Sequence, residues 1–431
     1  MKERVSVAVV GAGAAGLCAL RHLALPGVSS VNLTATCFEQ SPRVGGTWYY
    51  TEDIGTDKYG LPVHSSMYKH LRTNLPVECM AFPDYPFPKQ QPSFVEHEVV
   101  LKYLEDYAHN FNLTKYIKFL TKVKKIRPVS DEGSKFKVNW EVTTCSVANP
   151  GVEQTQTFNA VLLCNGHYAK PLVPDIPGVN SFPGQVTHSH DYRRTDGCDG
   201  KVVVILGAAS SGIDISLEMS AVAKQVYLSH NKPTLTTKLP DNLHQKPGIK
   251  RVDNSMIEFL DGSSVEADVL MFCTGYHYDY HFLDKDCGIV VHEERVTPLY
   301  KHLISSKYPS LGIVGICKQI VPFPMFDVQV RFFRSVLDGT CVLPSEADMN
   351  ADTEQDFQLR LTSGLPQRHA HLMGDRQFEY NDQLARMANT QPLSGHYKQL
   401  YLATHLLRLD NVMEYKNRNF ILDPTEVRVV K

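Results

Sequence analysis

The stretch VSVAVVGAGAAGLCAL, residues 5–20, decides the fold of this 431-residue chain. A short apolar run leads into the glycine turn GAGAAG at 11–16, and a helical pattern follows it to residue 25. A second apolar strand is expected over 31–38, directly before Glu39. Strand, glycine turn, helix and strand in this order predict a parallel sheet that binds a dinucleotide at the turn.

Each glycine of this turn has a separate physical role. Gly11 allows the tight turn, Gly13 lets the backbone approach a pyrophosphate, and Gly16 permits close packing of helix on strand. The phosphates then meet the positive end of the helix. Glu39 is placed to accept hydrogen bonds from the adenosine ribose, and its carboxylate repels a 2′-phosphate. We therefore expect FAD or NAD, rather than NADP, at this first site.

A second stretch, KVVVILGAASSGIDIS at 201–216, repeats the arrangement. Gly207 and Gly212 occupy the first and third glycine positions, whereas Ala209 occupies the middle one. The methyl group of Ala209 keeps a diphosphate farther from the backbone, so we expect a looser nucleotide contact here. The hydroxyls of Ser210 and Ser211 can recover part of this contact by donating hydrogen bonds to phosphate oxygens.

The strand after the second turn ends without an acid. QVYLSHNKP at 225–233 places Ser229, His230 and Lys232 where Glu39 stands in the first unit. These groups favour a 2′-phosphate, and the alternative is an exposed polar turn with a chance lysine. Two turns therefore predict two nucleotides: FAD stays bound at the first, and NADPH at the second delivers a hydride to it.

Composition and charge exclude other classes of partner. Hydrophobic residues make up 43% and charged residues 21%, as is typical of a soluble globular protein. A formal net charge of −2 provides no basic field for nucleic acid or anionic lipid. No run approaches the about 20 apolar residues of a membrane span, and the chain opens without a signal-like core. We expect small-molecule partners and a cytoplasmic protein, or a secreted one if a leader was removed before numbering.

The ten cysteines contain no Cys-x-x-Cys pair. Their scatter argues against a thioredoxin-like redox site and against zinc spacing. Most are expected to be buried as small apolar residues. We therefore expect neither a metal site nor a redox dithiol.

The remaining sequence suggests that one nucleotide unit is inserted in another. The proline-rich YAKPLVPDIPG at 168–178 is typical of a linker. Beyond the two turns, we expect antiparallel runs near 116–126, 136–144 and 153–163, a strand over 266–275, helices near 96–111 and 397–408, and an irregular segment over 59–94.

These elements predict an α/β fold with two Rossmann-like, doubly wound, three-layer dinucleotide-binding domains. The smaller NADPH-binding domain is expected over 169–282. It lies within a larger FAD-binding domain, whose first part is 1–168 and whose second part is 283–431.

Further motifs resemble those of the flavin-containing monooxygenases, and the resemblance runs from residue 5 to beyond 275. FPGQVTHSHDY at 182–192 fits the family's F-x-G-x-x-x-H-x-x-x-[FY] motif, which is the most specific of these matches. FEQ at 38–40 and GGTW at 45–48 resemble the FAD fingerprint, and CTGY at 273–276 resembles the strand end alanine-threonine-glycine-tyrosine. The segment 66–88 is similar to the one with the family's active-site asparagine, which maps to Asn74.

The resemblance implies a reaction. NADPH reduces FAD, and the reduced flavin takes up O₂ as a hydroperoxide on its C4a carbon. This oxidant passes one oxygen atom to a soft nucleophile, either a tertiary amine nitrogen or a sulfide sulfur. The protein excludes water and supplies hydrogen bonds, so Asn74 is the catalytic candidate, and His188 fixes the linker between domains rather than transferring a proton. Compact insect members that detoxify pyrrolizidine alkaloids by N-oxygenation are similar in form.

The predicted site residues lie at the two turns and in the family-like segments, with no metal ligand among them. The predicted cofactor-binding residues are Gly11, Gly13, Ala14, Ala15, Gly16, Glu39, Gln40, Gly46, Thr47, Trp48, Thr73, Asn74, Gly207, Ser210, Ser211, Gly212, Ser229, Lys232, Thr274 and Gly275.

Two departures from the family pattern leave the choice between NADPH and NADH open. One is Ala209, and the other is the lack of the usual arginine after LSHNK, although Arg193 and Arg194 are available nearby. A Baeyer-Villiger monooxygenase and a nucleotide-sensing flavoprotein without catalysis are the alternatives. A flavin disulfide reductase would need a dithiol. Whether the chain forms a homo-oligomer stays undecided by the sequence.

Overall fold

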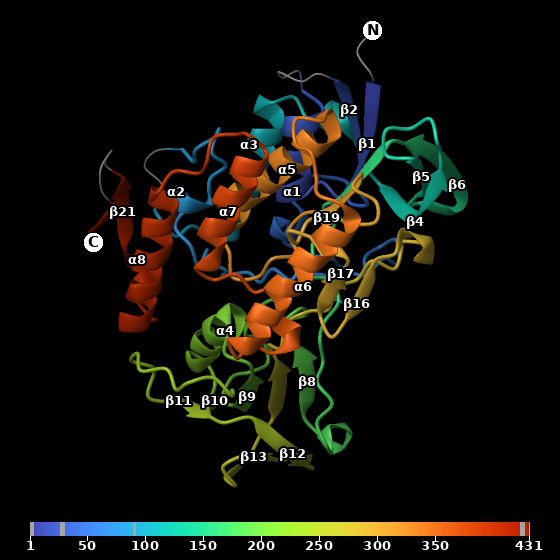
Figure 1. Cartoon of the computed structure of the whole chain (residues 1–431). Helices are drawn as coiled ribbons and strands as arrows, with labels where there is room; N and C mark the ends of the chain where they lie inside the picture. Colours follow the sequence, from blue (N-terminus) through green and yellow to red (C-terminus); the bar gives the residue numbers. More distant parts are fainter. Residues whose placement is uncertain (1–3, 26–30, 89–91, 423–426, 431) are drawn as a thin grey trace.

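The computed structural model describes residues 4–25, 31–88, 92–422 and 427–430. Two parallel sheets form the centres of a larger and a smaller lobe (Figure 1). The larger lobe contains the first glycine turn, and the smaller lobe contains the second. The predicted α/β class with two nucleotide-binding sheets is therefore confirmed.

The sheet of the larger lobe has the order β18-β19-β20-β7-β1-β2-β3. Its strands from β20 to β3 are parallel, and β18 and β19 extend it antiparallel. The central strands consist almost entirely of buried apolar residues, as a sheet covered on both faces requires. Their bounds are β1 (Arg4–Val10), β2 (Asn32–Phe38), β3 (Ile117–Lys118), β7 (Ala160–Leu163), β18 (Leu299–Tyr300), β19 (Ile304–Ser305) and β20 (Leu311–Ile313).

The smaller lobe has an all-parallel sheet of order β11-β10-β9-β15-β8. The residues between β11 and β15 form a separate three-stranded antiparallel sheet. The parallel strands are β8 (Gln185–His188), β9 (Val202–Leu206), β10 (Gln225–Ser229), β11 (Leu243–Lys246) and β15 (Val269–Phe272), and the antiparallel ones are β12 (Ile249–Asp253), β13 (Met256–Phe259) and β14 (Ser264–Glu266).

Helices cover the sheets and connect the lobes. The helix after each glycine turn packs on its own sheet, and α1 also packs on α5. The principal helices are α1 (Ala14–Leu23), α2 (Val77–Met80), α3 (His97–Asn110), α4 (Ser210–Ser220), α5 (Pro322–Asp338), α6 (Glu346–Thr362), α7 (Arg376–Met387) and α8 (His396–Asp410). Three small sheets complete the fold: β4 (Thr121–Ser130) with β5 (Val138–Ser146) and β6 (Asn149–Phe158), β16 (Val290–His292) with β17 (Arg295–Thr297), and β21 (Asn419–Leu422) with β22 (Val427–Val430).

The C-terminal region fastens the smaller lobe to the larger one. Leu400 of α8 shares a buried apolar cluster with Val203 and Ile205 of β9. The Lys416 ammonium makes an ion pair of 2.6 Å with Asp214 of α4, and both side chains are largely buried. The lobes are therefore joined by packing as well as by the two linkers.

Most predicted elements are confirmed, and two are corrected. The antiparallel runs form the β4-β5-β6 meander, and Ala160–Leu163 return to the parallel sheet as β7, as the sequence AVLLCNG predicts. Ile117 and Lys118 leave the meander as β3 of the parallel sheet. The strand predicted over 266–275 is only β15, because Gly275 has a left-handed φ of +88° and the chain there turns to pair with the opposite linker at Leu172.

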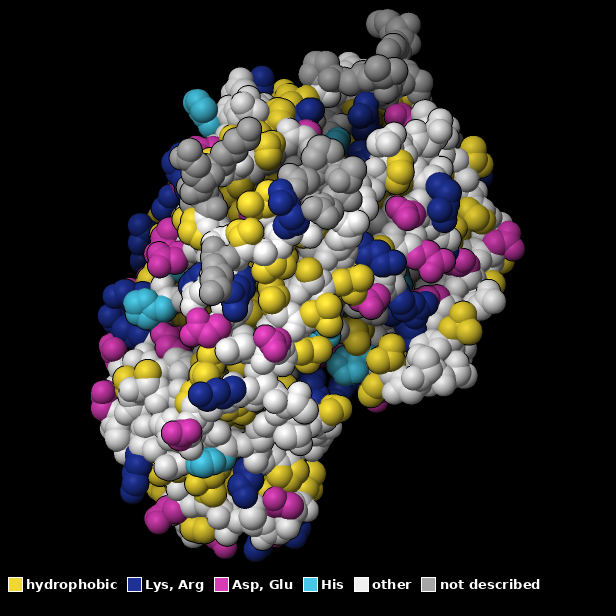
Figure 2. Space-filling model, turned by 90° about the vertical axis from the view of Figure 1, so that its left-hand side faces the viewer, with side chains coloured by type: hydrophobic (Ala, Val, Ile, Leu, Met, Phe, Trp, Pro, Cys, Tyr) yellow, Lys and Arg dark blue, Asp and Glu magenta, His cyan; other side chains and the backbone are white. Residues whose placement is uncertain are grey.

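The distribution of surface charge and the burial of the cysteines agree with the expectations from composition. Figure 2 shows basic and acidic side chains interspersed over one face, without an extended patch of either sign. All ten cysteines are buried and free. Among the described residues, no helix has both the length and the apolar character to cross a bilayer.

Candidate functional site

The first glycine turn is built so that side chains are excluded at its ends. Gly11 has a φ of +97°, and a Cβ atom there would lie 2.6 Å from the Cys164 carbonyl oxygen. A Cβ atom on Gly16 would lie 1.8 Å from the carbonyl oxygen of Gly11. Only glycine fits either position, because both contacts are with backbone atoms that cannot move aside.

The second turn repeats this construction closely. Gly207 has a φ of +114°, and a Cβ atom there would lie 2.4 Å from the carbonyl oxygen of Cys273. A Cβ atom on Gly212 would lie 1.7 Å from the Gly207 carbonyl oxygen. The two turns are therefore equivalent in backbone geometry, as the sequence repeat predicts.

The middle positions differ by one methyl group and not by backbone shape. Gly13 has φ −73° and ψ −169°, and Ala209 has φ −91° and ψ −169°, so both are extended residues immediately before a helix. Neither α1 nor α4 has a side-chain cap or an acid in its first turn. Their first N–H groups are thus free of side-chain caps and suit the phosphates of a dinucleotide.

Glu39 lies at the end of β2 beside the first turn. Its carboxylate is buried and accepts hydrogen bonds from the backbone N–H groups of Ala12, at 2.6 Å, and Ser41, at 2.7 Å. These bonds fix the carboxylate and leave lone pairs for further donors such as ribose hydroxyls. Gln40, which follows it, is half-buried.

A third glycine segment, residues 45–48, closes on the first turn. Gly46 has a φ of +56°, and a Cβ atom on it would lie 2.9 Å from the Cα atom of Gly13. The Thr47 carbonyl accepts a hydrogen bond from Ser65, and the Trp48 ring meets Phe323 of α5 edge-on at 6.4 Å. The structure therefore brings these predicted residues to the first turn, and Gly13 and Gly46 keep the space between the two segments narrow.

Asn74 joins the two lobes. Its side-chain amide donates a hydrogen bond of 3.0 Å to the hydroxyl of Ser210, the first residue of α4. Thr73 is buried, and its hydroxyl accepts a hydrogen bond from the Val95 backbone. Residues predicted for the active site and for the second turn are thus in direct contact, although 136 positions separate them.

Two further basic groups lie at the second turn. The Lys232 ammonium donates to the Ala208 carbonyl at 3.2 Å, and burial together with the positive charge of Arg408 lowers its pKa. Arg408 of α8 also approaches the Ser210 hydroxyl at 3.5 Å. Sequence reasoning missed Arg408, since the only signal for it is a lone arginine on the otherwise mostly apolar segment LATHLLRL, about 200 positions away.

The other residues predicted around the second turn differ in accessibility. Ser211 is exposed, and a Cβ atom on Gly275 would meet nothing within 4 Å. The hydroxyl of Ser229, in contrast, is fully buried and donates to the Pro247 carbonyl at 2.8 Å, and Thr274 donates to the Leu172 carbonyl. The structure therefore directs Ser229 and Thr274 to neighbouring backbone rather than to the open side of the turn.

Arg193 and Arg194 both have partners within the described residues. The buried Arg193 guanidinium donates only to backbone carbonyls, three of which come from the larger lobe and two from its own segment. Arg194 pairs with Glu52 and Asp196. The contribution to 2′-phosphate binding expected of Arg193 does not fit this geometry, because its guanidinium joins the two lobes, and that of Arg194 stays a prediction.

His188 of the linker motif is also held in place. Its Nδ1 atom accepts a hydrogen bond of 3.0 Å from the His190 backbone, and the rings of both histidines meet Tyr276 edge-on. Burial lowers the pKa of His188 to about 4, so the imidazole is neutral near pH 7. This geometry favours the positional role predicted for His188 over proton transfer.

We expect the protein to lose stability as the pH falls from 7 to 5. Burial lowers the pKa of His167 to about 3 and that of His188 to about 4, whereas unfolded histidines titrate near about 6.5. Below about pH 6.5 protons therefore bind the unfolded chain preferentially, and each group lowers the free energy of unfolding by up to about 1.4 kcal/mol per pH unit.

Chemical denaturation at a series of pH values checks this expectation. His167→Asn and His188→Asn should each flatten the fall in stability between pH 6.5 and 5, whatever their effect at pH 7. His405→Asn, at an exposed position of α8, serves as the control. An unchanged slope in both buried variants would contradict the argument.

Loops from the carboxyl ends of both sheets meet between the lobes. In Figure 1, β1 and β8 run toward the middle of the molecule from opposite ends. Tyr168, which follows β7, lies 5.4 Å from Tyr276, which follows β15, and the ammonium of Lys318, beyond β20, lies 4.5 Å from the Tyr278 ring. Ligands of open α/β sheets bind at such carboxyl edges, so the two nucleotide turns open toward a shared region.

Comparisons with known proteins agree with this arrangement. The model of the Flavin-binding monooxygenase-like family matches residues 4–238 and 231–404. FMO GS-OX-like 2, a flavin-containing monooxygenase of Arabidopsis thaliana, is 40% identical over 402 residues, which cover 88% of this chain and 84% of the relative.

Two solved structures resemble the whole chain. S-allyl-L-cysteine S-oxygenase from Allium sativum superposes with a TM-score of 0.88 at 35% identity, covering 97% of this chain and 96% of its own. Tmm from Pelagibacter sp. strain HTCC7211 superposes with a TM-score of 0.85 at 28% identity, covering 99% and 96%.

Proposed function

Because the chain belongs to the Flavin-binding monooxygenase-like family, whose members use FAD and NADPH, we propose that it catalyses the S-oxygenation of a small thioether with O₂. The observation that carries this proposal is the similarity along nearly the whole chain to S-allyl-L-cysteine S-oxygenase. The similarity to a plant relative of the GS-OX-like group supports it.

The two turns fit two dinucleotides. We assign FAD to the first turn, because Glu39 is fixed where it disfavours a 2′-phosphate and the 45–48 segment closes on Gly13. We assign NADPH to the second, where Ser210, Lys232 and Arg408 form a polar and basic group. In the same proposal, 169–282 is the NADPH-binding domain, and 1–168 with 283–431 is the FAD-binding domain.

The protein's own groups position the reactants. Bound FAD, once reduced by NADPH, supplies the activation of O₂. Asn74 can both donate and accept hydrogen bonds without titrating, and its contact with Ser210 keeps its amide at the entrance of the second turn. Trp48 and Phe323 pack together beside the first turn and exclude water from that side.

Purified protein tests the proposal. We expect it to be yellow, to bleach with NADPH under nitrogen, to recolour in air, and to convert methyl thioethers to sulfoxides in amounts that match the NADPH consumed. Absorbance follows the flavin, and mass spectrometry distinguishes sulfoxide from N-oxide. Consumption of NADPH with hydrogen peroxide as the sole product, across thioethers and tertiary amines, would contradict an oxygenase.

N-oxygenation of a tertiary amine is the second candidate within the same reaction class. N-oxygenation of pyrrolizidine alkaloids stays a prediction from resemblance alone. The same assay decides between the two nucleophiles, since a thioether and a tertiary amine of equal size compete for one oxidant. A clear excess of N-oxide would reverse the order of the two candidates.

A further inference from the structure

Lys318 lies between the two carboxyl edges. It follows β20, which pairs in parallel with β7, so its loop leaves the sheet at the edge where the first glycine turn lies. Its ammonium lies over the ring of Tyr278, 4.5 Å from the centroid, and Tyr278 belongs to the linker after β15. A single cation therefore reaches from the larger lobe to the linker of the smaller one.

This ammonium has no acid as a direct partner. In the described ranges, no carboxylate lies within ion-pair distance of Lys318. Glu294 acts on it from farther away, and its two oxygens accept from the His277 ring and the Tyr278 backbone. Burial lowers the pKa of Lys318, and the charge of Glu294 opposes this shift. Lys318 is half-buried and its ammonium faces a ring instead of a carboxylate, so the position favours an anion from outside the chain.

Besides Glu294, which accepts from the Tyr278 backbone, a histidine lies beside the Tyr278 ring. The His167 ring lies 5.3 Å from the same tyrosine, and its buried Nε2 atom has no hydrogen-bond partner within the described ranges, although the Gly315 carbonyl raises its pKa slightly. Burial lowers the pKa of both His167 and His369, and the charge of Lys318 adds to both shifts; for His369, Arg368 and Lys232 contribute as well. The ammonium and a free imidazole nitrogen are thus two polar groups around one aromatic ring.

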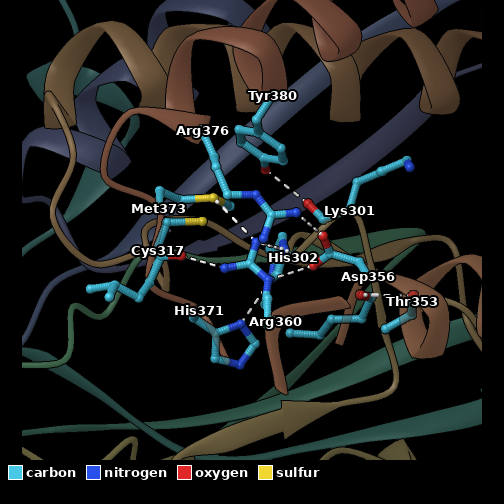
Figure 3. A network of polar contacts seen from close by, with 12 residues as sticks. Lys301, His302, Cys317, Thr353, Asp356, Arg360, His371, Met373, Arg376 and Tyr380 are labelled. Atoms are coloured by element: carbon cyan, nitrogen blue, oxygen red, sulfur yellow. Dashed lines mark hydrogen bonds and ion pairs between the residues drawn. The ribbon is translucent and has the colours of Figure 1, made fainter. Parts of the chain in front are cut away.

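The main chain holds Lys318 rigidly. Its N–H donates to the His371 carbonyl at 2.9 Å, and its carbonyl accepts from the Met373 N–H at 3.0 Å. Behind this pairing, the buried Arg360 donates to the Leu372 carbonyl and to Asp356 (Figure 3). The Lys318 backbone is therefore fixed by a network that does not use its ammonium.

We propose that Lys318 binds the anionic group, a carboxylate or a sulfate, of the thioether substrate. The inference rests on the proposed S-oxygenation and adds a substrate class, namely sulfides that carry a negative charge. A phosphate of NADPH offers the same chemistry. Lys232 and Arg408 already lie at the second turn, however, whereas Lys318 comes from the loop at the FAD-binding sheet.

Three thioethers of similar size test the charge preference of the holoenzyme. The probes are 4-(methylthio)butanoate, 4-(methylthio)butan-1-ol and 3-(methylthio)propylamine. We expect wild-type kcat/KM to be highest for the butanoate. In Lys318→Met, the ratio of kcat/KM for the butanoate to that for the alcohol should fall about 10- to 100-fold, chiefly through KM, because a charge-assisted bond is lost. Lys318→Arg should keep the preference, and Lys318→Glu should shift it toward the amine.

Binding without turnover gives a second readout. Titration of the oxidised holoenzyme with the butanoate, followed by flavin fluorescence, should show the same loss of affinity in Lys318→Met. Flavin content and circular dichroism establish that each variant is folded. Lys232→Met is the matched control for the cofactor phosphate, since we expect it to raise the KM for NADPH.

The outcomes distinguish an anion on the substrate from a phosphate of NADPH. They also distinguish failure of the role inferred for Lys318 from failure of the proposed S-oxygenation. A Lys318→Met enzyme with a raised KM for NADPH and an unchanged charge preference would assign the lysine to the cofactor and overturn the inference. Equal wild-type kcat/KM for butanoate and alcohol would overturn it too, while S-oxygenation would stand. A wild-type enzyme that forms sulfoxide from none of the three probes would overturn the proposed function itself.

Discussion

Gly13→Val protein should purify without its yellow colour. A Cβ atom on Gly13 would lie 3.4 Å from the Gly46 Cα atom, so the two γ-carbons of valine must enter the narrow space between the first turn and the 45–48 segment. That space is the one we assign to the FAD pyrophosphate. We expect FAD affinity to fall about 100-fold, the upper range for overpacking a tight site. Absorbance near the flavin maximum, relative to protein, measures the loss.

Gly13→Ala is the matched control for this variant. Its single methyl group meets Gly46 at ordinary contact distance, and the second turn already has an alanine at the same backbone angles, at Ala209. The alanine variant should fold and retain part of its flavin. Stoichiometric flavin in Gly13→Val would refute the placement of the pyrophosphate at this turn.

Asn74→Ala should keep its FAD but lose oxygenation. The amide is exposed and makes its hydrogen bond to Ser210, so its removal leaves no buried group unpaired and should not destabilise the fold. We expect thioether oxygenation to fall about 100-fold, as when one polar group is removed from a reacting centre. NADPH consumption should continue, with hydrogen peroxide as the product. The ratio of sulfoxide to NADPH consumed is the measurement.

Ser210→Ala separates two explanations for such a loss. If Asn74 acts only by bridging to α4, removal of the Ser210 hydroxyl should reproduce the effect, because it removes the same hydrogen bond. If Asn74 acts on the reacting groups, Ser210→Ala should retain most of the sulfoxide yield and chiefly raise the KM for NADPH. An Asn74→Ala enzyme with an unchanged yield would remove Asn74 from the mechanism.

Local sequence patterns predicted the two nucleotide units well. The turn at 11–16 and its repeat at 207–212 have the backbone angles and steric limits expected from their glycines. The limits on Gly16 and Gly212 act between residues five positions apart, as the contact of Gly16 with the Gly11 carbonyl illustrates, whereas those on Gly11 and Gly207 come from the distant carbonyls of Cys164 and Cys273. Interactions of such short range can be read from the order of residue types. The 266–275 strand was predicted too long, since its end is set by pairing with a distant linker.

The sequence did not reveal which polar side chains lie at the glycine turns and which are bonded to neighbouring backbone groups. Ser229 is the last residue of β10 and Lys232 follows that strand, yet one is fully buried and bonded to Pro247 and the other reaches the second turn. Arg193 has the positive charge to bind a phosphate, but its guanidinium donates hydrogen bonds to backbone carbonyls of both lobes. Side-chain direction and competing acceptors decided these cases, and neither is encoded within a short window.

The amino-acid order by itself determined two glycine turns, the acid that follows β2 and a second parallel-sheet unit inserted in the first, because helix and strand periodicity act over a few residues. Only the tertiary structure decided that Asn74 meets Ser210, that Arg408 joins them from α8, and that the Lys318 ammonium lies over Tyr278. Those contacts join residues about 40 to 200 positions apart. Their partners are fixed by how the chain closes around its cores, where burial makes every unpaired charge costly.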